Sequence, residues 1–528
     1  MVTARRIGLL VLIAWMHVGG TCGGGSGGGG SAPVKKVEAP DSRCLALASQ
    51  FPPGFDLVPN APGLAIALSF TPGVAEPVDL EPVPPAVAAP GPFVDLRSDI
   101  ARDACSGFLD PAFAGVLAVA PDLAFVSASS CEGVAFVRSD TGALRSLDVS
   151  VPAGFAPGDE PFNPAPGTTE SRVALSTRFC VDAAPGAVDS FGAAIPPGCD
   201  SARPSFFSNF TSAAALVAGS LFVSTSNLGR NAGRPDTQFL PGSVLVFDLD
   251  LTATPPSIGP DPTTPLIFTS GFNPTHVTSY RTPGGRDLVL VTVSGATGLV
   301  ADDPSTPERE AGGVALTPAA IDVIDAAQRR LIATVPLGLA ALSYEELAID
   351  PTGRVAFTGS AIARRLYAVD LAPLDALPTD PSAPVQVLDG SSGPDARIFD
   401  AAHPFEVPAR PDGAPVATCP GYIVGTAFSA AGDALYATDF CDGTLTLVGV
   451  DVSGSPPAPV PGDSSHFQVL RSIPIAAPLD PSSLGLARAP GAVRVRPGIP
   501  GVDYHGPDVF FLVGLPEGAL CGVRIDSQ

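Results

Sequence analysis

Positive charge is scarce in this sequence. Lys and Arg together number 29 against 52 Asp and Glu, which gives a net charge of −23 at pH 7, and only 15% of the residues are charged. A polyanion would meet net repulsion, and no cluster of basic residues offsets it. We therefore expect no nucleic-acid partner.

The short motifs that mark common catalytic sites are also missing. The sequence has no Gly-x-Ser-x-Gly elbow, phosphate-binding loop, His-Glu-x-x-His or Cys-x-x-Cys-His sequence, and its five His are widely scattered. There is no Cys-x-x-Cys pair that would suggest a zinc site. We therefore expect no cofactor and no resident metal, and the sequence favours a binding protein over an enzyme.

Long apolar runs are absent from the chain after its N-terminal segment. No stretch in that part reaches eighteen uninterrupted apolar residues. Arg5 and Arg6 precede an apolar run from Ile7 to Val18. About twelve apolar residues are too few to cross roughly 30 Å of hydrocarbon, so this run indicates a secretory signal. The chain is expected to be exported.

Cys22 follows this run directly after Gly19, Gly20 and Thr21, and a Gly/Ser-rich stretch occupies 23–31. The small residues before the Cys resemble the acylation site of bacterial lipoproteins. The resemblance implies a signal peptide over 1–21, a lipidated Cys22 that begins a flexible tether over 22–40, and anchoring in the cell envelope, at the outer membrane or cell surface. The alternative is a signal cleaved nearby that leaves Cys22 as a free thiol.

A strand–turn–strand pattern recurs six times in the rest of the chain. The 57 Gly and 60 Pro favour many short strands over long helices. In each copy a short apolar strand is followed by a second apolar strand that ends in Asp, as in a hairpin. The first strands begin near residues 123, 221, 288, 354, 434 and 509, and the recurring acids are Asp140, Asp248, Asp325, Asp370, Asp451 and Asp526.

Further apolar stretches flank each hairpin and complete units of four strands. Before the hairpins lie FAGVLAV, SAAALV, THVTSY, YEELAI, YIVGTAF and SSLGLA, and after them LRSLDV, LIATVPL, VQVL and FQVLRSIPI. Four-stranded units that start 67 to 98 residues apart are the signature of a β-propeller with loop insertions. The pattern resembles YVTN-type propeller repeats, most closely over Gly271–Asp325, and the resemblance covers about Ala101–Ser527.

The predicted fold is therefore all-β, a single β-propeller over 41–528 with four-stranded antiparallel blades. Six units are legible, and 44–100 can supply a seventh blade from degenerate strands. The resemblance to YVTN-type propellers implies seven blades, and six are the close alternative. Only two residues follow Asp526, so the last blade must borrow its outer strand from the N-terminal segment of about 41–100. Gly63–Phe70 (GLAIALSF) is the best strand there and is expected to close the ring.

Eight cysteines remain once Cys22 is set aside, an even number that suits an oxidising compartment. The repeat suggests how they pair. Two pairs bracket the same kind of two-strand unit, one pair shares a Pro/Gly-rich loop, and the last pair would pin the ring closure. The expected disulfides are Cys105–Cys131, Cys419–Cys441, Cys180–Cys199 and Cys44–Cys521.

Three features are candidates for function. Long links at 152–204, 227–242, 295–318 and 389–420 should enlarge one rim of the propeller, where loops can bind a partner. Within them Asp302 and Asp303 are weak candidates for Ca²⁺, without the spaced Asp pattern of a calcium loop. His276, at the entry to an innermost strand, is a weak candidate for a catalytic residue in the central channel. The recurring Asp residues are expected to have structural roles at turns.

These features predict a lipid-anchored, extracytoplasmic propeller that binds a protein, glycan or envelope component through loops on one rim. One alternative is a propeller hydrolase or lactonase that acts on a small molecule in the central channel. Such an enzyme would need a cluster of polar residues there, including His276. The other alternative is a structural envelope lipoprotein. A quinone-dependent propeller is not expected, because the only Trp, Trp15, lies inside the signal.

Overall fold

The computed structural model describes the strands and most turns of the chain. The described residues are 43–47, 53–61, 63–69, 74–88, 94–95, 113–155, 164–200, 203–204, 206–229, 238–298, 309–310, 313–315, 317–338, 347–360, 364–389, 405–407, 423–440, 442–451, 458–459, 469–474, 489–497, 507–514 and 518–524. Cys22 and the expected signal and tether lie outside them.

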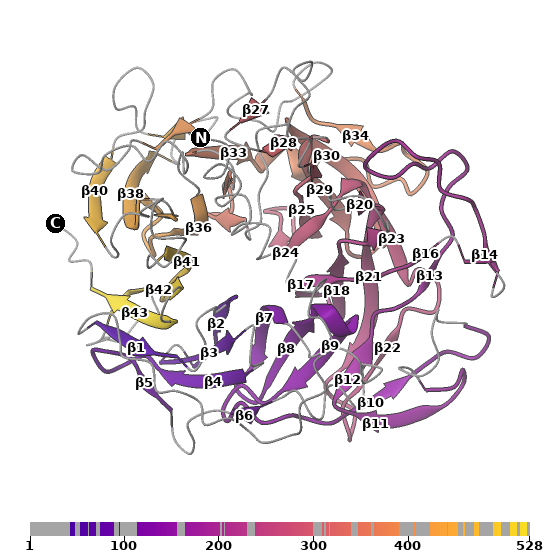
Figure 1. The fold of residues 1–528 in the computed structure, drawn as a ribbon, viewed down its shortest axis with the longest axis horizontal. Helices are drawn as coiled ribbons and strands as arrows, with labels where there is room; N and C mark the ends of the chain where they lie inside the picture. The colour runs from indigo at the N-terminus through magenta and orange to yellow at the C-terminus, as the bar shows by residue number, and fades with distance from the viewer. Residues whose placement is uncertain are drawn as a thin grey trace, which may run out of the picture.

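Sheets of four or more strands stand around one axis and form a β-propeller (Figure 1). Among the described residues, six such sheets are each built around one stretch of the chain, and a seventh combines strands from both ends. We number these blades 1 to 7 in chain order. Within each blade, neighbouring strands run antiparallel from the axis outward, as the sequence predicts.

Blades 1 to 3 come from the N-terminal half. Blade 1 contains β2 (Phe55–Leu57), β3 (Leu64–Ser69), β4 (Val74–Asp79), β5 (Ala86–Val87) and β6 (Val94–Asp95). Blade 2 contains β7 (Phe113–Ala120), β8 (Leu123–Ala128), β9 (Gly133–Val137) and β12 (Ala174–Ser176). Blade 3 contains β17 (Thr211–Val217), β18 (Ser220–Thr225), β21 (Pro241–Asp250), β22 (Ser257–Pro260) and β23 (Leu266–Phe272).

Blades 4 to 7 complete the ring. Blade 4 contains β24 (Pro274–Arg281), β25 (Asp287–Val293), β29 (Ala319–Asp325) and β30 (Arg330–Gly338). Blade 5 contains β31 (Ala348–Ile349), β32 (Val355–Gly359), β33 (Arg365–Asp370) and β35 (Phe405–Glu406). Blade 6 contains β36 (Ile423–Phe428), β37 (Ala434–Asp439), β38 (Thr444–Asp451), β39 (Ala458–Pro459) and β40 (Val469–Pro474). Blade 7 contains β41 (Ala489–Val495), β42 (Val509–Gly514), β43 (Ala519–Val523) and β1 (Cys44–Ala46).

Short elements decorate this ring. Small sheets pair β13 (Cys180–Val181) with β16 (Phe206–Phe207), β14 (Cys199–Asp200) with β15 (Arg203–Pro204), β19 (Leu228–Gly229) with β20 (Gln238–Phe239), and β28 (Gly313–Ala315) with β26 (Thr297–Gly298) and β27 (Arg309–Glu310). Two 3-10 turns, η1 (Ser129–Cys131) and η3 (Ala372–Ala376), follow β8 and β33. No helix within the described ranges is long and apolar enough to cross a membrane.

The six hairpins predicted from the sequence are confirmed. β8 pairs with β9, β18 with β21, β25 with β29, β32 with β33, β37 with β38, and β42 with β43, all antiparallel. Both faces of these middle strands are buried, since each face packs on a neighbouring blade. This explains why they read as continuous apolar runs and not as alternating ones.

The core consists of clusters that lie between consecutive blades. Between blades 2 and 3, Phe125 packs edge-on against Phe136 at 5.9 Å between ring centroids, and Phe136 and Phe247 belong to one buried cluster. Equivalent clusters join every other neighbouring pair, including blade 7 to blade 1, where Phe510 and Phe55 are fully buried. Apolar burial at these junctions, rather than one central core, holds the ring together.

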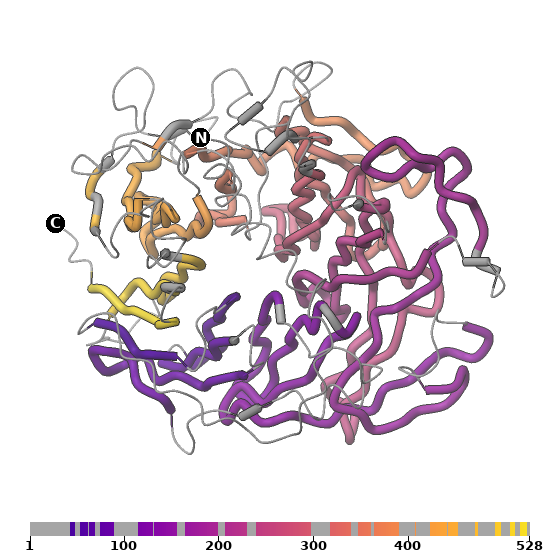
Figure 2. The backbone as a smooth tube through the Cα atoms, in the orientation of Figure 1, coloured from indigo at the N-terminus to yellow at the C-terminus, as the bar shows by residue number. Residues whose placement is uncertain are grey.

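The ring closes with an N-terminal strand, but not the one predicted. The indigo N-terminal and the yellow C-terminal segments lie side by side in Figure 2. Cys44 lies opposite Cys521 in the register of β1 and β43, and a disulfide joins the two residues. Gly63–Phe70, which we expected to close the ring, instead provides β3 in the middle of blade 1. This six-residue apolar strand is buried, as an interior strand of a blade must be. The three-residue strand β1 around Cys44 instead forms the outer edge of blade 7.

Two predicted outer strands belong to neighbouring blades. The LRSLDV stretch forms β10 (Leu147–Ser150), which pairs in parallel with β22 of blade 3 and carries β11 (Thr169–Arg172) on its other side. VQVL forms β34 (Gln386–Val387), which pairs in parallel with β30 of blade 4. The outer strands of blades 2 and 5 are β12 and β35 instead. LIATVPL and FQVLRSIPI form β30 and β40, the outer strands of blades 4 and 6, as predicted.

The innermost strand of blade 7 also differs from the prediction. It is β41, which begins just after the SSLGLA stretch that we expected to form it. SSLGLA itself lies outside the described residues.

Candidate functional site

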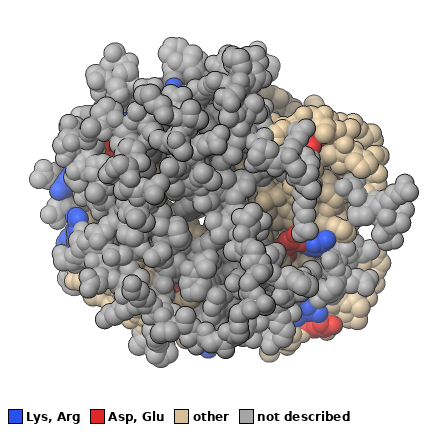
Figure 3. Space-filling model, viewed as in Figure 1, with Lys and Arg blue, Asp and Glu red and all other residues tan. Residues whose placement is uncertain are grey.

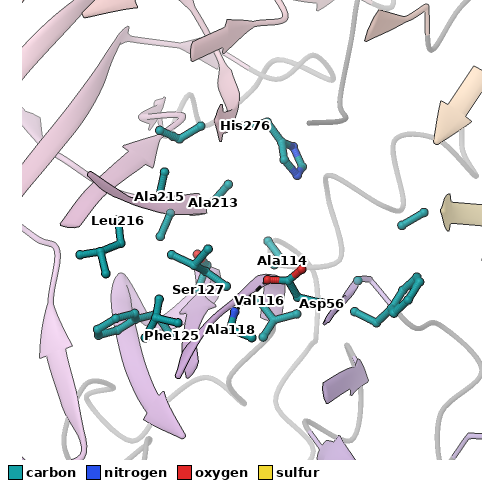
Figure 4. A pocket seen from close by; sticks show the side chains of 18 of the residues that line it. Asp56, Ala114, Val116, Ala118, Phe125, Ser127, Ala213, Ala215, Leu216 and His276 are labelled. Atoms are coloured by element: carbon teal, nitrogen blue, oxygen red, sulfur yellow. Dashed lines mark hydrogen bonds between the residues drawn. The ribbon is translucent and has the colours of Figure 1, made fainter. Parts of the chain in front are cut away.

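A cavity of about 270 Å³ lies on the propeller axis (Figure 4). Its walls come from the innermost strands β2, β7, β17, β24 and β41, which belong to five different blades. Many of the lining residues are small, including Gly54, Gly115 and Ala side chains from β7 and β17. A Cβ on Gly115 would lie 3.0 Å from the carbonyl oxygen of Ser212, so Gly115 allows β7 to approach β17 closely.

Asp56 places a carboxylate in the wall of this cavity. Its Oδ1 accepts a hydrogen bond from the backbone N–H of Leu57 at 2.9 Å, and its Oδ2 accepts one from the N–H of Ala118 at 2.9 Å. The second bond crosses from blade 1 to β7 of blade 2 (Figure 4). Two backbone donors fix the orientation of the carboxylate, while each oxygen retains further capacity to accept hydrogen bonds.

Arg494 brings a guanidinium to the same wall from β41. Its Nε lies 3.8 Å from Oδ1 of Asp56, and its Cζ lies 5.9 Å from the centre of the Phe55 ring. About a fifth of each of the two charged side chains is exposed, 21% for Arg494 and 22% for Asp56. The ion pair therefore borders open space and is accessible from the cavity.

His276 projects into the cavity from β24, across from Asp56 (Figure 4). It lies opposite Thr292 of β25, just after an irregularity in the strand register between Pro274 and His276. We expect His276 in the central channel, and it lines this cavity between innermost strands. A catalytic role for this residue stays a prediction.

The cavity thus combines one carboxylate, one guanidinium, one imidazole and two serines, Ser127 and Ser279, with an apolar lining. Such a set can donate and accept hydrogen bonds with a polar ligand and can pack against its carbon skeleton. Sequence reasoning missed Asp56 and Arg494. Asp56 belongs to a three-residue strand, and Arg494 belongs to the innermost strand that was assigned to the wrong stretch.

The cysteines agree with the sequence prediction as far as they are described. The Cys44–Cys521 disulfide is confirmed. Cys131 and Cys180 each take part in a disulfide. Cys105, Cys419 and Cys441 lie outside the described residues, as does the side chain of Cys199, so the other three pairings stay predictions.

The calcium candidates Asp302 and Asp303 also lie outside the described residues. Within the described ranges no three His, Cys, Asp or Glu side chains are grouped so as to hold a metal ion. Two of the recurring Asp residues accept local hydrogen bonds. Asp370 accepts one from the N–H of Ala372 at 3.0 Å, and Asp325 one from the N–H of Gln328 at 2.7 Å, which are turn-forming roles.

Buried carboxyl groups outside the cavity join neighbouring blades. Asp322 of blade 4 accepts hydrogen bonds from the backbone N–H and the hydroxyl of Ser270, both at 2.6 Å, and burial raises its pKa. Asp439 of blade 6 accepts a bond from Nε of Arg364 at 2.7 Å, and burial raises its pKa although the guanidinium opposes the change. These groups are built into the blade junctions and do not face the axis cavity.

Charged side chains on the face seen in Figure 3 form small separate groups. No broad basic surface is visible among the described residues of that face, in keeping with the low basic content of the sequence.

The link at 152–204, which was expected to enlarge one rim, lies mostly within the described residues and supplies β12, the outer strand of blade 2. The link at 389–420 supplies β35, the outer strand of blade 5, so these two links are not rim loops alone. Half or more of each of the links 227–242, 295–318 and 389–420 lies outside the described residues. Their role in binding stays a prediction.

Comparison with known proteins finds only distant similarity to solved structures. No family model matches the sequence, and no curated protein matches it. Similar solved structures include hydrazine synthase of Kuenenia stuttgartiensis (11% identity, TM-score 0.46, 94% of this chain and 100% of that chain) and the β-propeller domain of Cps50 (Swd1) of Myceliophteria thermophila (10%, 0.42, 91% and 99%). The periplasmic gluconolactonase of Pseudomonas aeruginosa is also similar, at 16% identity and a TM-score of 0.32, over 60% of this chain and 67% of that chain.

Proposed function

We propose that this protein is an extracytoplasmic, lipid-anchored β-propeller that binds a glycan of the cell envelope. The axial cavity would hold one hydroxyl-bearing unit of the glycan, and loops of one rim would contact the remainder. Export and anchoring rest on the N-terminal signal and Cys22. The binding proposal rests on the cavity.

The observation that carries the proposal is the fixed carboxylate of Asp56 beside Arg494. A sugar hydroxyl both donates and accepts hydrogen bonds, so adjacent hydroxyls can donate to Asp56 and accept from the guanidinium. The C–H faces of a sugar can pack on Phe55 and on the Ala side chains of the wall. A volume of about 270 Å³ suits one small unit of a ligand and is too small for a protein segment with large side chains.

Thermal shift measurements on the full mature chain test this proposal, with glucose, N-acetylglucosamine and glucono-δ-lactone as probes. A ligand at a hundred times its Kd should stabilise the protein by about 2.7 kcal/mol. Asp56→Asn removes the charge and should weaken binding about tenfold or more. Asp250→Asn is a matched control, because this exposed carboxylate also accepts two backbone N–H bonds, from Thr252 and Ala253. Binding that survives Asp56→Asn unchanged would contradict the proposal.

Hydrolysis in the same cavity is the second candidate function, favoured by the position of His276 across from Asp56. A neutral imidazole could take a proton from a water that attacks a lactone carbonyl, and Arg494 could stabilise the negative charge on the carbonyl oxygen. Release of acid from glucono-δ-lactone above its spontaneous rate, lost in His276→Gln while sugar binding remains, would favour this function. A structural envelope lipoprotein would show neither binding nor turnover.

A further inference from the structure

Three side chains that can carry charge line the axial cavity, and they come from three different blades. Among the described lining residues these are Asp56 of β2, Arg494 of β41 and His276 of β24. The other described lining side chains are apolar, apart from two serines. The summed charge of the three groups is therefore zero while His276 is neutral, and it becomes positive once the imidazole is protonated.

The negative charge of Asp56 is countered within its own wall of the cavity. The backbone N–H groups of Leu57 and Ala118 each donate to the carboxylate at 2.9 Å, and Nε of Arg494 lies 3.8 Å from its Oδ1. A ligand ammonium would meet Arg494 there, and a ligand carboxylate would meet Asp56. This wall therefore favours neutral hydroxyl groups over a charged group of either sign.

His276 faces this ion pair from the other side of the cavity (Figure 4). It belongs to blade 4, whereas Asp56 and Arg494 belong to blades 1 and 7. Small side chains of β7 and β17, such as Ala114 and Ala213, line much of the remaining wall. A ligand that spans the cavity thus meets the ion pair at one end and the imidazole at the other.

We propose that the axial cavity binds an acidic sugar, a uronic acid unit, with its hydroxyls at Asp56 and Arg494 and its carboxylate at His276. This inference rests on the proposed function and names the class of glycan unit that binds. An imidazole in water takes up a proton near pH 6.5, and a carboxylate close to it favours the protonated form. Binding of the acid and protonation of His276 therefore strengthen each other, so that binding takes up a proton near neutral pH.

Isothermal titration calorimetry on the mature chain tests this inference, with glucuronate, glucose and glucosamine as probes. Measurements at about pH 5.5 and about pH 8 lie above the usual carboxyl pKa of about 4, so glucuronate stays ionised in both. We expect glucuronate to bind about tenfold more tightly than glucose at the lower pH, and this ratio to fall toward one at the higher pH. Buffers of different ionisation enthalpy should report proton uptake with glucuronate and none with glucose.

Substitutions of His276 provide the second measurement. His276→Gln keeps a polar side chain that cannot be protonated, so the ratio of the two affinities should stay near one at both pH values and proton uptake should vanish. His276→Lys is charged at both pH values and should keep the glucuronate preference at the higher pH. Arg281→Gln is the matched control, because it removes positive charge from the same strand at a side chain that is 72% exposed. It should retain the preference of the parent and its pH dependence.

Proton uptake is measured on the parent chain, so it applies even where a His276 variant does not fold. Glucose binding that depends on Asp56, together with equal affinity for glucuronate at the lower pH, would overturn the acidic ligand and leave the proposed function standing. Tighter binding of glucosamine than of glucuronate, or a glucuronate preference that His276→Gln retains, would also overturn it. Absence of binding by all three probes would overturn the proposed function and the acidic ligand together.

Discussion

Blade 4 and blade 7 show two ways to complete the same sheet. Blade 4 comes from one stretch of chain, and its outer strand β30 pairs with β29 through seven residue pairs. Blade 7 takes its outer strand from the other end of the chain, and β1 pairs with β43 through only three. The Cys44–Cys521 disulfide supplements this short pairing, and Arg496 joins blade 7 to blade 1. Where backbone pairing is short, covalent and charged contacts carry more of the stability.

The disulfide should account for the largest difference between these blades. A Cys44→Ser/Cys521→Ser variant should lose about 2–5 kcal/mol of unfolding free energy, because the bridge joins residues 477 apart and restrains the unfolded chain. Urea unfolding without reductant measures this loss. An unchanged midpoint and slope would mean that β1 holds the ring closed by pairing and packing alone.

Substitution of Arg496 should cause the next largest loss of unfolding free energy. It is only 1% exposed, and its guanidinium donates to Oε1 of Glu81 at 2.9 Å and to the carbonyl of Leu80 at 2.8 Å, which joins blade 7 to blade 1. Arg496→Met keeps much of the volume but loses both bonds, so we expect a loss of about 2–3 kcal/mol in urea unfolding.

Arg281 of blade 4 provides the control for this substitution. It is 72% exposed and 3.8 Å from Asp287, so Arg281→Met should cost less than about 0.5 kcal/mol. Equal losses in the two variants would show that Arg496 adds nothing specific to closure.

Tyr280 should give a smaller, pH-dependent effect on the blade 4 side. Its hydroxyl donates to the carbonyl of Gly353 in the turn before β32 at 2.9 Å, and burial raises its pKa to about 12. The folded state keeps this proton between pH 10 and 12 while the unfolded state loses it, so stability falls as pH rises through that window.

Tyr280→Phe should cost about 1 kcal/mol at pH 7 and lose less stability than the parent between pH 10 and 12. Urea unfolding at a series of pH values measures the difference in unfolding free energy between the two proteins. The contributions of the other tyrosines cancel in this difference. Parallel curves for the two proteins would contradict the raised pKa.

Asp322 of blade 4 should give the smallest effect, a change of relative stability with pH. Because burial raises its pKa, the folded state binds more protons than the unfolded state just above the ordinary carboxyl pKa of 3.8, and stability falls as pH rises through that range. Asp322→Asn retains an acceptor for Ser270 without this dependence. The stability of the variant relative to the parent should therefore increase from pH 3 upward, and a relative decrease would contradict the assignment.

Local pattern predicted the strands better than it predicted their partners. The hairpins were found because both strands are apolar, short and joined by turn residues, as in Leu123–Val137. LRSLDV and VQVL were recognised as strands, yet they pair with neighbouring blades. The outer edge of a blade has unpaired backbone groups that can pair with any nearby strand. The hydrophobic pattern alone therefore does not specify which strand pairs there.

The residues of the candidate site were harder to predict from the sequence than the strands. His276 was placed in the channel because it lies at the entry to a recognisable innermost strand. Asp56 lies in the three-residue strand β2, where no periodicity can develop, and its partner N–H on Ala118 is 62 residues away. Its position depends on ring closure, which brings blades 7, 1 and 2 together. Only the alternation around Arg494 in AVRVRP could have indicated a side chain that faces the axis.

The parallel strands β10 and β34 also affect how this architecture can change over time. Each arises within one repeat but completes the edge of an adjacent one. Excising or duplicating a single repeat would therefore leave a neighbour with an uncovered border, even where the cut falls neatly between hairpins. Lineages of this protein should gain or lose such repeats in linked groups, and engineered versions with altered ring size should respect the same grouping.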